Sequence, residues 1–188
     1  MYDILIVSDT HGRTGRLNEL VEYRQKLMKN GEPLTIIHLG DGLSDLFSCS
    51  QYNNIISHAV RGNCDFSITD RMSPYGEEMP ISRLIQLNRY KVFITHGHAF
   101  SVKSGYEEIC REASRLNADF VLFGHTHLPI LEYIEKGSIR GIEKDLVLFN
   151  PGSLASMFDG SFGNLSISEN GFLFSHGKYD NITKNNNK

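Results

Sequence analysis

Five apolar segments of the chain each end in a turn where a glycine stands next to an aspartate, a histidine or an asparagine. In chain order, these turns are Asp9-Thr10-His11-Gly12, Gly40-Asp41-Gly42, Gly62-Asn63-Cys64-Asp65, Thr95-His96-Gly97-His98 and Gly124-His125-Thr126-His127. Short apolar segments rich in β-branched and aromatic residues are typical of buried strands. A lone histidine is more often structural than a ligand, but five such strand ends in one small chain rarely arise by chance. The pattern therefore favours a sheet whose strand ends bring polar side chains together.

The first part of the chain alternates between strand and helix. Residues 4–7 form a continuous apolar run, which is expected of a strand covered on both faces. Apolar residues then recur at helical spacing over 17–28, and a second strand is predicted over 34–39. A strand, a helix and a strand in this order imply a right-handed crossover and a parallel pair. The turns that carry Asp9 and Asp41 then lie at the same carboxyl edge of the sheet, where open α/β sheets place their sites.

The remaining segments complete a single predicted domain over residues 1–177. They are a short helix over 43–50, a strand over 55–60, a loop over 66–80, a hairpin of strands over 81–87 and 90–95, a helix over 106–116 and a strand over 120–123. Four strand-like segments follow, at 128–134, 146–149, 164–168 and 171–175. No helical pattern separates these four, so we expect them to pair antiparallel as a second sheet. The polar residues 178–188 are expected to form a frayed tail.

The composition is that of an ordinary globular domain. The 188 residues are 40% hydrophobic and 22% charged, which is enough to bury a core. A net charge of −3 offers no global field for nucleic acid or an anionic membrane, and no apolar run approaches the roughly 18 residues that span a bilayer. The N-terminus enters a strand at once, without the pattern of a signal peptide. Three cysteines without paired spacing favour a reducing cytoplasm over a disulfide framework.

The turns supply seven candidate metal ligands, which are Asp9, His11, Asp41, Asn63, His96, His125 and His127. Three oxygen donors with four imidazoles suit borderline divalent ions; we expect Mn²⁺, with Fe²⁺, Zn²⁺, Ni²⁺ and Mg²⁺ as alternatives. Seven ligands are too many for one ion and about right for two, if one carboxylate bridges. Two ions can hold both oxygens of a phosphoryl group and make hydroxide available near neutral pH. Two dications against two aspartates leave a positive charge, which favours an anionic substrate.

Taken in order, the five turns resemble the motifs of the calcineurin-like metallophosphoesterase superfamily, from residue 3 to about residue 176. The blocks Arg61-Gly62-Asn63-Cys64-Asp65 and Asn150-Pro151-Gly152-Ser153 resemble its small bacterial and archaeal YfcE-type phosphodiesterase branch, whose eukaryotic relative is the retromer subunit Vps29. The resemblance implies an α/β (α+β) fold in which a two-sheet β-sandwich is flanked by helices, an αββα arrangement.

The resemblance also implies how the ligands divide between two ions bridged by Asp41: a first ion held by Asp9, His11 and His127, and a second held by Asn63, His96 and His125. A hydroxide that bridges the ions would attack phosphorus in line with the leaving alkoxide. His98 would contact a phosphate oxygen or orient a ligand rather than bind a metal. The catalytic candidates are therefore Asp41, Asn63, Cys64 and His98.

Cys64 departs from much of the superfamily, in which a histidine at this position protonates the leaving group. Cysteine is a poorer general acid, and a neutral thiol offers no cationic hydrogen bond to a monoester dianion. We therefore predict a preference for phosphodiesters over alkyl monoesters. The alternative interpretation of Cys64 is a small buried spacer.

These patterns predict a metal-dependent phosphodiesterase that acts on a small phosphate ester. One alternative is a phosphomonoesterase or nucleotide phosphatase, and another is a non-catalytic, Vps29-like protein-binding scaffold. The complete ligand set favours catalysis, because a scaffold need not keep it. A nucleic-acid substrate is disfavoured because the chain has no basic stripe, and a homo-oligomer is compatible with the sequence.

Overall fold

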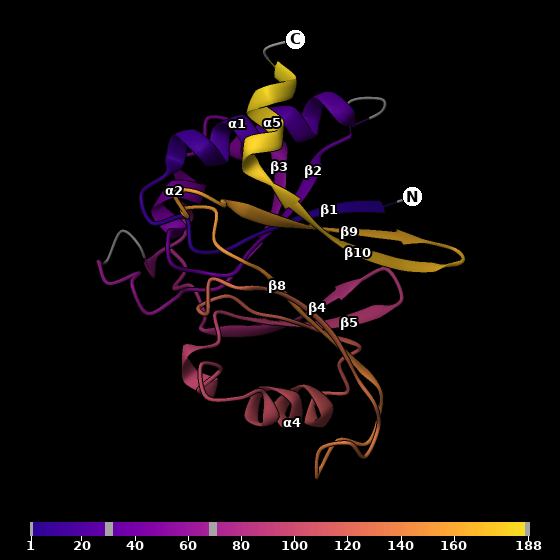
Figure 1. Cartoon of the computed structure of the whole chain (residues 1–188). Helices are drawn as coiled ribbons and strands as arrows, with labels where there is room; N and C mark the ends of the chain where they lie inside the picture. The colour runs from indigo at the N-terminus through magenta and orange to yellow at the C-terminus, as the bar shows by residue number, and fades with distance from the viewer. Residues whose placement is uncertain (1, 29–31, 68–70, 187–188) are drawn as a thin grey trace.

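A computed structural model describes residues 2–28, 32–67 and 71–186, and it shows two β-sheets packed face to face between helices (Figure 1). The first sheet has the strand order β10-β9-β1-β2-β3. Its strands are β1 (Tyr2–Val7), β2 (Leu34–His38), β3 (Ile55–Ala59), β9 (Ser161–Ser168) and β10 (Gly171–Lys178). β1, β2 and β3 are mutually parallel. At the other edge of β1, β9 pairs antiparallel with β1, and β10 pairs antiparallel with β9. The predicted parallel pair of β1 and β2 is therefore confirmed.

The second sheet has the strand order β4-β5-β6-β8-β7. Its strands are β4 (Ser82–Leu87), β5 (Tyr90–Thr95), β6 (Phe120–Leu122), β7 (Pro129–Ile134) and β8 (Leu146–Pro151). β5, β6 and β8 are parallel at its centre, and the antiparallel strands β4 and β7 form its edges. The predicted hairpin of β4 and β5 is confirmed.

The expectation that the four C-terminal strands form a second sheet of their own is wrong. β7 and β8 extend the sheet that contains β6, whereas β9 and β10 extend the sheet that contains β1. The reason is that both β1 and β6 are buried on both faces and each leaves a free edge, which a later strand fills. A hydrophobic pattern identifies a strand but does not say which edge it joins.

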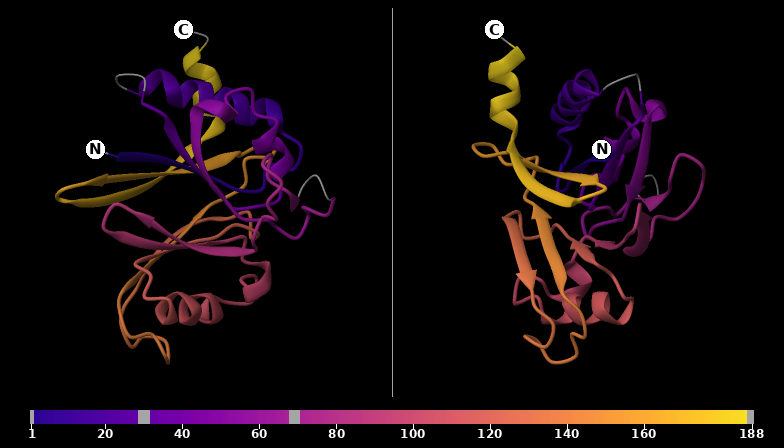
Figure 2. Two further views of the ribbon diagram at one scale, coloured as in Figure 1. Left: turned by 180° about the vertical axis from the view of Figure 1, so that it is seen from behind. Right: turned by 90° about the vertical axis from the view of Figure 1, so that its right-hand side faces the viewer.

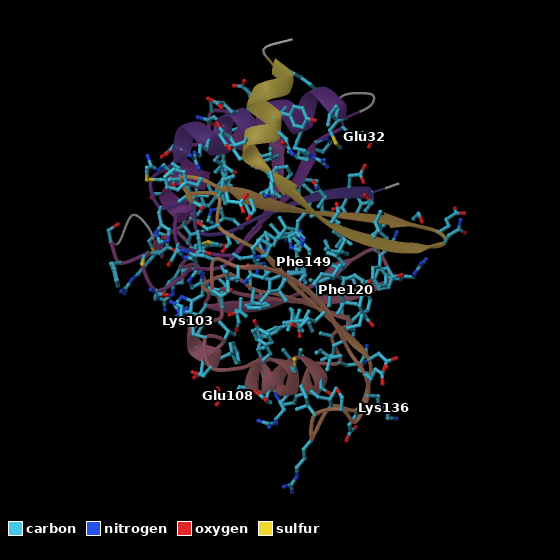
Figure 3. All side chains as sticks on the ribbon, viewed as in Figure 1. Glu32, Lys103, Glu108, Phe120, Lys136 and Phe149 are labelled. Atoms are coloured by element: carbon cyan, nitrogen blue, oxygen red, sulfur yellow. The ribbon has the colours of Figure 1, made fainter. Side chains whose placement is uncertain are left out.

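Three apolar layers hold the sandwich together. Figures 1 and 2 show the helices on the outer sides of the two sheets. The layer between the sheets contains Phe120 and Phe149 of the second sheet, which are labelled in Figure 3. Outside the first sheet lie α1 (Thr14–Leu27), α2 (Leu43–Phe47) and α5 (Tyr179–Asn186). Outside the second sheet lies α4 (Glu107–Arg115), and short 3-10 turns, η1 (Tyr52–Asn54) and η2 (His98–Phe100), complete the elements. The expected αββα sandwich is confirmed.

The structure also differs from the sequence prediction at the C-terminal end. The segment predicted as a frayed tail begins with α5, and Tyr179 and Ile182 are buried in the same apolar layer as Leu17 and Leu20 of α1. Tyr179 and Ile182 are three residues apart, so both lie on the same face of the helix. Residues 187 and 188 lie outside the described part, as do residues 68–70 of the predicted loop.

Among the helices in the described ranges, none combines the length and the hydropathy that spanning a bilayer requires.

Candidate metal centre

The predicted ligands gather where the parallel strands of the two sheets end. Asp9 and His11 follow β1, Asp41 follows β2 and Asn63 follows β3. The other ligand histidines follow β5 (His96) and β6 (His125 and His127). The Oδ1 atom of Asp9 lies 3.0 Å from His127 Nε2 and 3.7 Å from His11 Nε2. These distances bring together turns that lie more than 110 residues apart in the chain.

Six of the seven ligands form two groups whose donor atoms all lie within 4.8 Å of one another. One group contains Asp9, His11 and His127, and the other contains Asp41, His96 and His125. Asp41 lies between them, because its Oδ2 atom is 3.3 Å from His96 Nε2 and 3.9 Å from His11 Nε2. Asp41 therefore stands between two groups of side chains, each of which could hold a metal ion.

Asp9 and His96 direct buried acceptor atoms to the place where the two groups meet. Asp9 Oδ2 accepts from Ser8 Oγ (2.5 Å) and the His125 N–H (3.1 Å), whereas the buried Oδ1 has no hydrogen-bond partner among the described residues. His96 Nδ1 lies 2.7 Å from the Leu39 carbonyl oxygen and must donate to it. In neutral His96, the Nε2 lone pair then lies 3.2 Å from His125 Nδ1 and 3.3 Å from a carboxylate oxygen of Asp41. A divalent ion at this point would be bound by these lone pairs, so the residues fit metal binding.

The charge states of the ligands also suit metal ions. Burial raises the pKa of Asp9, but the imidazoles of His11, His127 and His96 outweigh burial and hold it well below its usual range. Burial likewise opposes ionisation of Asp41, yet His96 lowers its pKa to about 2. Burial and the charge of His96 lower the pKa of His125 to about 4. At neutral pH the site therefore presents two carboxylates and an uncharged His125 imidazole with a lone pair free to bind a metal.

Five of the seven ligands adopt left-handed backbone conformations, with φ from 42° to 66°. They are Asp9, His11, Asp41, His125 and His127. This region costs a residue with a side chain about 1–2 kcal/mol. Such strain persists only where surrounding contacts impose it, and it is typical of functional sites. The turns thus aim consecutive polar side chains at one point, which a regular strand could not do.

Two buried aspartates hold these turns. Asp65 accepts four backbone N–H groups, from Asp41 (2.9 Å), Gly42 (2.9 Å), Leu43 (3.1 Å) and Gly62 (2.7 Å). Asp45 accepts from Thr10 Oγ1 (2.6 Å), the Gly12 N–H (2.8 Å) and Thr14 Oγ1 (2.5 Å). Asp65 thus bonds the backbone of the turn that carries the ligand Asp41, and its described partners are backbone N–H groups rather than imidazoles. Sequence analysis missed Asp45, although an aspartate four residues after Asp41 was visible.

Asn63, Cys64 and His98 surround the two groups. The Oδ1 atom of Asn63 is buried without a partner in the described part of the chain, which leaves it available as a ligand. Cys64 is exposed, so its interpretation as a buried spacer is wrong; the thiol accepts from Asn63 Nδ2 at 3.3 Å. Desolvation and the neighbouring Asp41 raise the pKa of Cys64 to about 11, so the thiol is neutral near pH 7. The His98 ring centre lies 5.5 Å from that of His96.

Asn150 supports the turn that carries His125 and His127. Its Nδ2 donates to the Gly124 carbonyl (2.9 Å) and Thr126 Oγ1 (3.1 Å), while its Oδ1 accepts from the Gly152 N–H (2.9 Å). A plain turn would need only the last of these bonds.

Comparison with known proteins places the chain in a family. The model of the calcineurin-like phosphoesterase superfamily domain matches residues 2–181. The chain is 28% identical over 187 residues to phosphodiesterase YfcE of Escherichia coli K12, covering 92% of this chain and 90% of YfcE.

Two solved structures share the fold. A predicted phosphoesterase of Streptococcus pneumoniae TIGR4 superposes with a TM-score of 0.67 at 22% identity, covering 95% of this chain and 90% of that one. Vacuolar protein sorting 29 of Cryptosporidium parvum superposes with a TM-score of 0.64 at 16% identity, covering 94% and 97%. The predicted resemblance to this superfamily and to its YfcE and Vps29 branch is confirmed. The chain belongs to the calcineurin-like phosphoesterase superfamily.

Proposed function

We propose that this protein is a phosphodiesterase that uses two divalent metal ions, with Mn²⁺ as the expected ion, to hydrolyse a small phosphate ester. The observation that carries the proposal is the pair of ligand groups that meet at Asp41. A single structural ion would need only one such group. The phosphodiesterase YfcE, which matches nearly the whole chain, supports the same class of reaction.

Each ligand has a role that follows from its place. Asp9, His11 and His127 would hold one ion, and Asp41, His96 and His125 would hold the other together with Asn63 Oδ1. Ions bound there would lower the pKa of water and offset the negative charge of a phosphoryl group. Asp41 would serve both positions, and Leu39 fixes the His96 tautomer whose Nε2 faces the site.

The groups at the rim favour an anionic substrate that is not a dianion. Lys103, labelled in Figure 3, is exposed and its charge contributes, after burial and His96, to the low pKa of His125. Lys103 would therefore attract a phosphate to the same side as His98. Cys64 is neutral and can donate only an uncharged hydrogen bond, which suits the single negative charge of a diester.

The test compares hydrolysis of bis-p-nitrophenyl phosphate with that of p-nitrophenyl phosphate by metal-stripped protein, before and after addition of Mn²⁺. We expect diester turnover that requires the metal and is lost in Asp41→Ala. The control is Asp119→Asn, because Asp119 accepts the Lys91 N–H (2.7 Å) beside the start of β6, at the opposite strand end from the metal ligands.

Three results would contradict the proposal. Faster monoester turnover would favour a phosphomonoesterase or nucleotide phosphatase. Turnover by Asp41→Ala at the wild-type rate would remove the metal centre from the reaction. A folded protein without turnover in any divalent metal would favour a scaffold role like that of Vps29.

A further inference from the structure

We propose that Asp45 and Asp65 are positioning residues that set the affinity of the metal centre, by holding the two strained ligand turns and by supplying half of its negative charge. Neither side chain belongs to the two ligand groups. Both accept hydrogen bonds from the turns that carry those ligands, and both are almost fully buried. The inference rests on the proposed metal centre but not on the reaction, so its test needs no turnover.

Both carboxylate oxygens of Asp65 are fully used as hydrogen-bond acceptors, so a proton or an NH₂ group in their place would face backbone N–H donors. Oδ2 accepts the N–H groups of Asp41 and Gly62, and Oδ1 accepts those of Gly42 and Leu43. These donors come from two separate turns, one carrying Asp41 and the other Asn63. One carboxylate therefore ties the bridging ligand to a ligand of the second ion, and it holds Asp41 at a φ of 56°.

Asp45 does the same for the other position. Its carboxylate accepts the Gly12 N–H directly after His11, and it accepts the hydroxyls of Thr10 and Thr14 on either side. His11 has a φ of 42° and its N–H donates to the Asp41 carbonyl at 3.1 Å. The His11 turn is thus held between Asp45 and the Asp41 turn.

Asp45 and Asp65 change the net charge of the site when two divalent ions are bound. Asp9 and Asp41 alone would leave two dications with a surplus of positive charge. With Asp45 and Asp65 there are four carboxylates, which balance two dications. When no metal is bound, the four buried carboxylates repel one another. Replacing Asp45 or Asp65 by a neutral residue therefore weakens the electrostatic attraction of the site for the ions, and it also loosens the turns. Outer carboxylates of this kind orient ligands in metal sites, and their loss costs about 10- to 100-fold in metal affinity.

The substitution Asp65→Asn tests the charge and the hydrogen bonds of Asp65 without changing the size of the side chain. It keeps the shape of the side chain but turns one acceptor oxygen into an NH₂ group, which must face two backbone N–H donors. Asp45→Asn is milder, because the hydroxyls of Thr10 and Thr14 can accept as well as donate and therefore adapt to an NH₂ group. The matched control is again Asp119→Asn, which removes a carboxylate that also accepts a backbone N–H, away from the metal ligands.

The experiment measures Mn²⁺ binding to metal-stripped protein by calorimetry, together with the melting temperature of each variant in EDTA. We expect Asp65→Asn to weaken Mn²⁺ binding about 10- to 100-fold, Asp45→Asn to weaken it less, and Asp119→Asn to stay within about twofold of wild type. A merely structural role would lower the melting temperature in EDTA and leave the affinity of the folded protein unchanged.

Wild-type affinity in both Asp65→Asn and Asp45→Asn would overturn the inference. If Asp65→Asn does not fold, Asp45→Asn and the more severe Asp45→Ala decide the matter, since both act on the His11 turn alone. Wild-type protein that binds no Mn²⁺ would overturn the metal centre itself, which is a distinct result.

Discussion

Replacing Gly62 by alanine should disable the site through one misplaced carboxylate. A Cβ atom at Gly62 would lie 2.0 Å from Asp41 Oδ1, 2.6 Å from Asp41 N and 2.8 Å from Asp41 Cγ. Real Cβ contacts essentially never fall below 3.0 Å, so the carboxylate must withdraw by about 1 Å. The backbone of Asp41 cannot follow freely, because its N–H is bonded to Asp65.

A displacement of about 1 Å at a reacting centre can cost about 100-fold in rate, and overpacking of this kind costs about 1–3 kcal/mol of stability. We therefore expect Gly62→Ala to lower kcat/KM for bis-p-nitrophenyl phosphate by about two orders of magnitude at saturating Mn²⁺. The free energy of unfolding in EDTA, measured with urea, should fall by about 1–3 kcal/mol.

The control is Gly15→Ala, which makes the same chemical change in open space. A Cβ atom at Gly15 meets nothing within 4 Å, and Gly15 lies in α1. Its activity should stay unchanged and its free energy of unfolding should rise by about 0.5–1 kcal/mol. If Gly62→Ala kept kcat/KM within about threefold of wild type, Asp41 would tolerate displacement and the bridging role would be refuted.

Three further predictions test other parts of the structure. Cys64→His adds a cationic donor and should raise kcat/KM for the monoester relative to the diester by at least about tenfold; an unchanged ratio would remove Cys64 from substrate selection. Asn150→Ala leaves the Gly124 carbonyl without its donor and should lower the free energy of unfolding by about 1–3 kcal/mol in urea, whereas no loss would mean that water replaces the amide. Burial and Glu19 raise the pKa of Tyr179 to about 12, so the unfolded state loses its proton first and stability should fall as the pH rises from 10 towards 12. Tyr179→Phe should make this dependence less steep, and an equal slope in both proteins would contradict the prediction.

The ligands could be predicted from the sequence because each stands in a turn that a glycine and an apolar run mark. Asp9 and Asp41 each follow an apolar strand, and a helix connects the two strands. This connection predicts a parallel pair, which places both residues at the same edge of the sheet. The outer aspartates could not be assigned in the same way. Asp65 bonds the backbone of a turn more than 20 residues earlier, and no local pattern encodes such a contact.

The partition of the C-terminal strands could not be predicted either. β8 and β9 are separated by a loop without a helix, which locally resembles a simple antiparallel connection. What sends them to different sheets is the free edge of β1 on one side and of β6 on the other. The helix α5 was missed because only Tyr179 and Ile182 of its described side chains are apolar and buried.

The position of β1 has a consequence for how the chain is made. β1 presents Asp9, but it pairs with β9 along its free edge, and Tyr2 lies opposite Ile167. During translation, residues 8–160 are added after β1 and before β9, and until then one edge of β1 is open. Loop closure over such a distance slows folding, and an open strand edge can pair with another chain. Nascent chains are therefore most prone to aggregate in this interval.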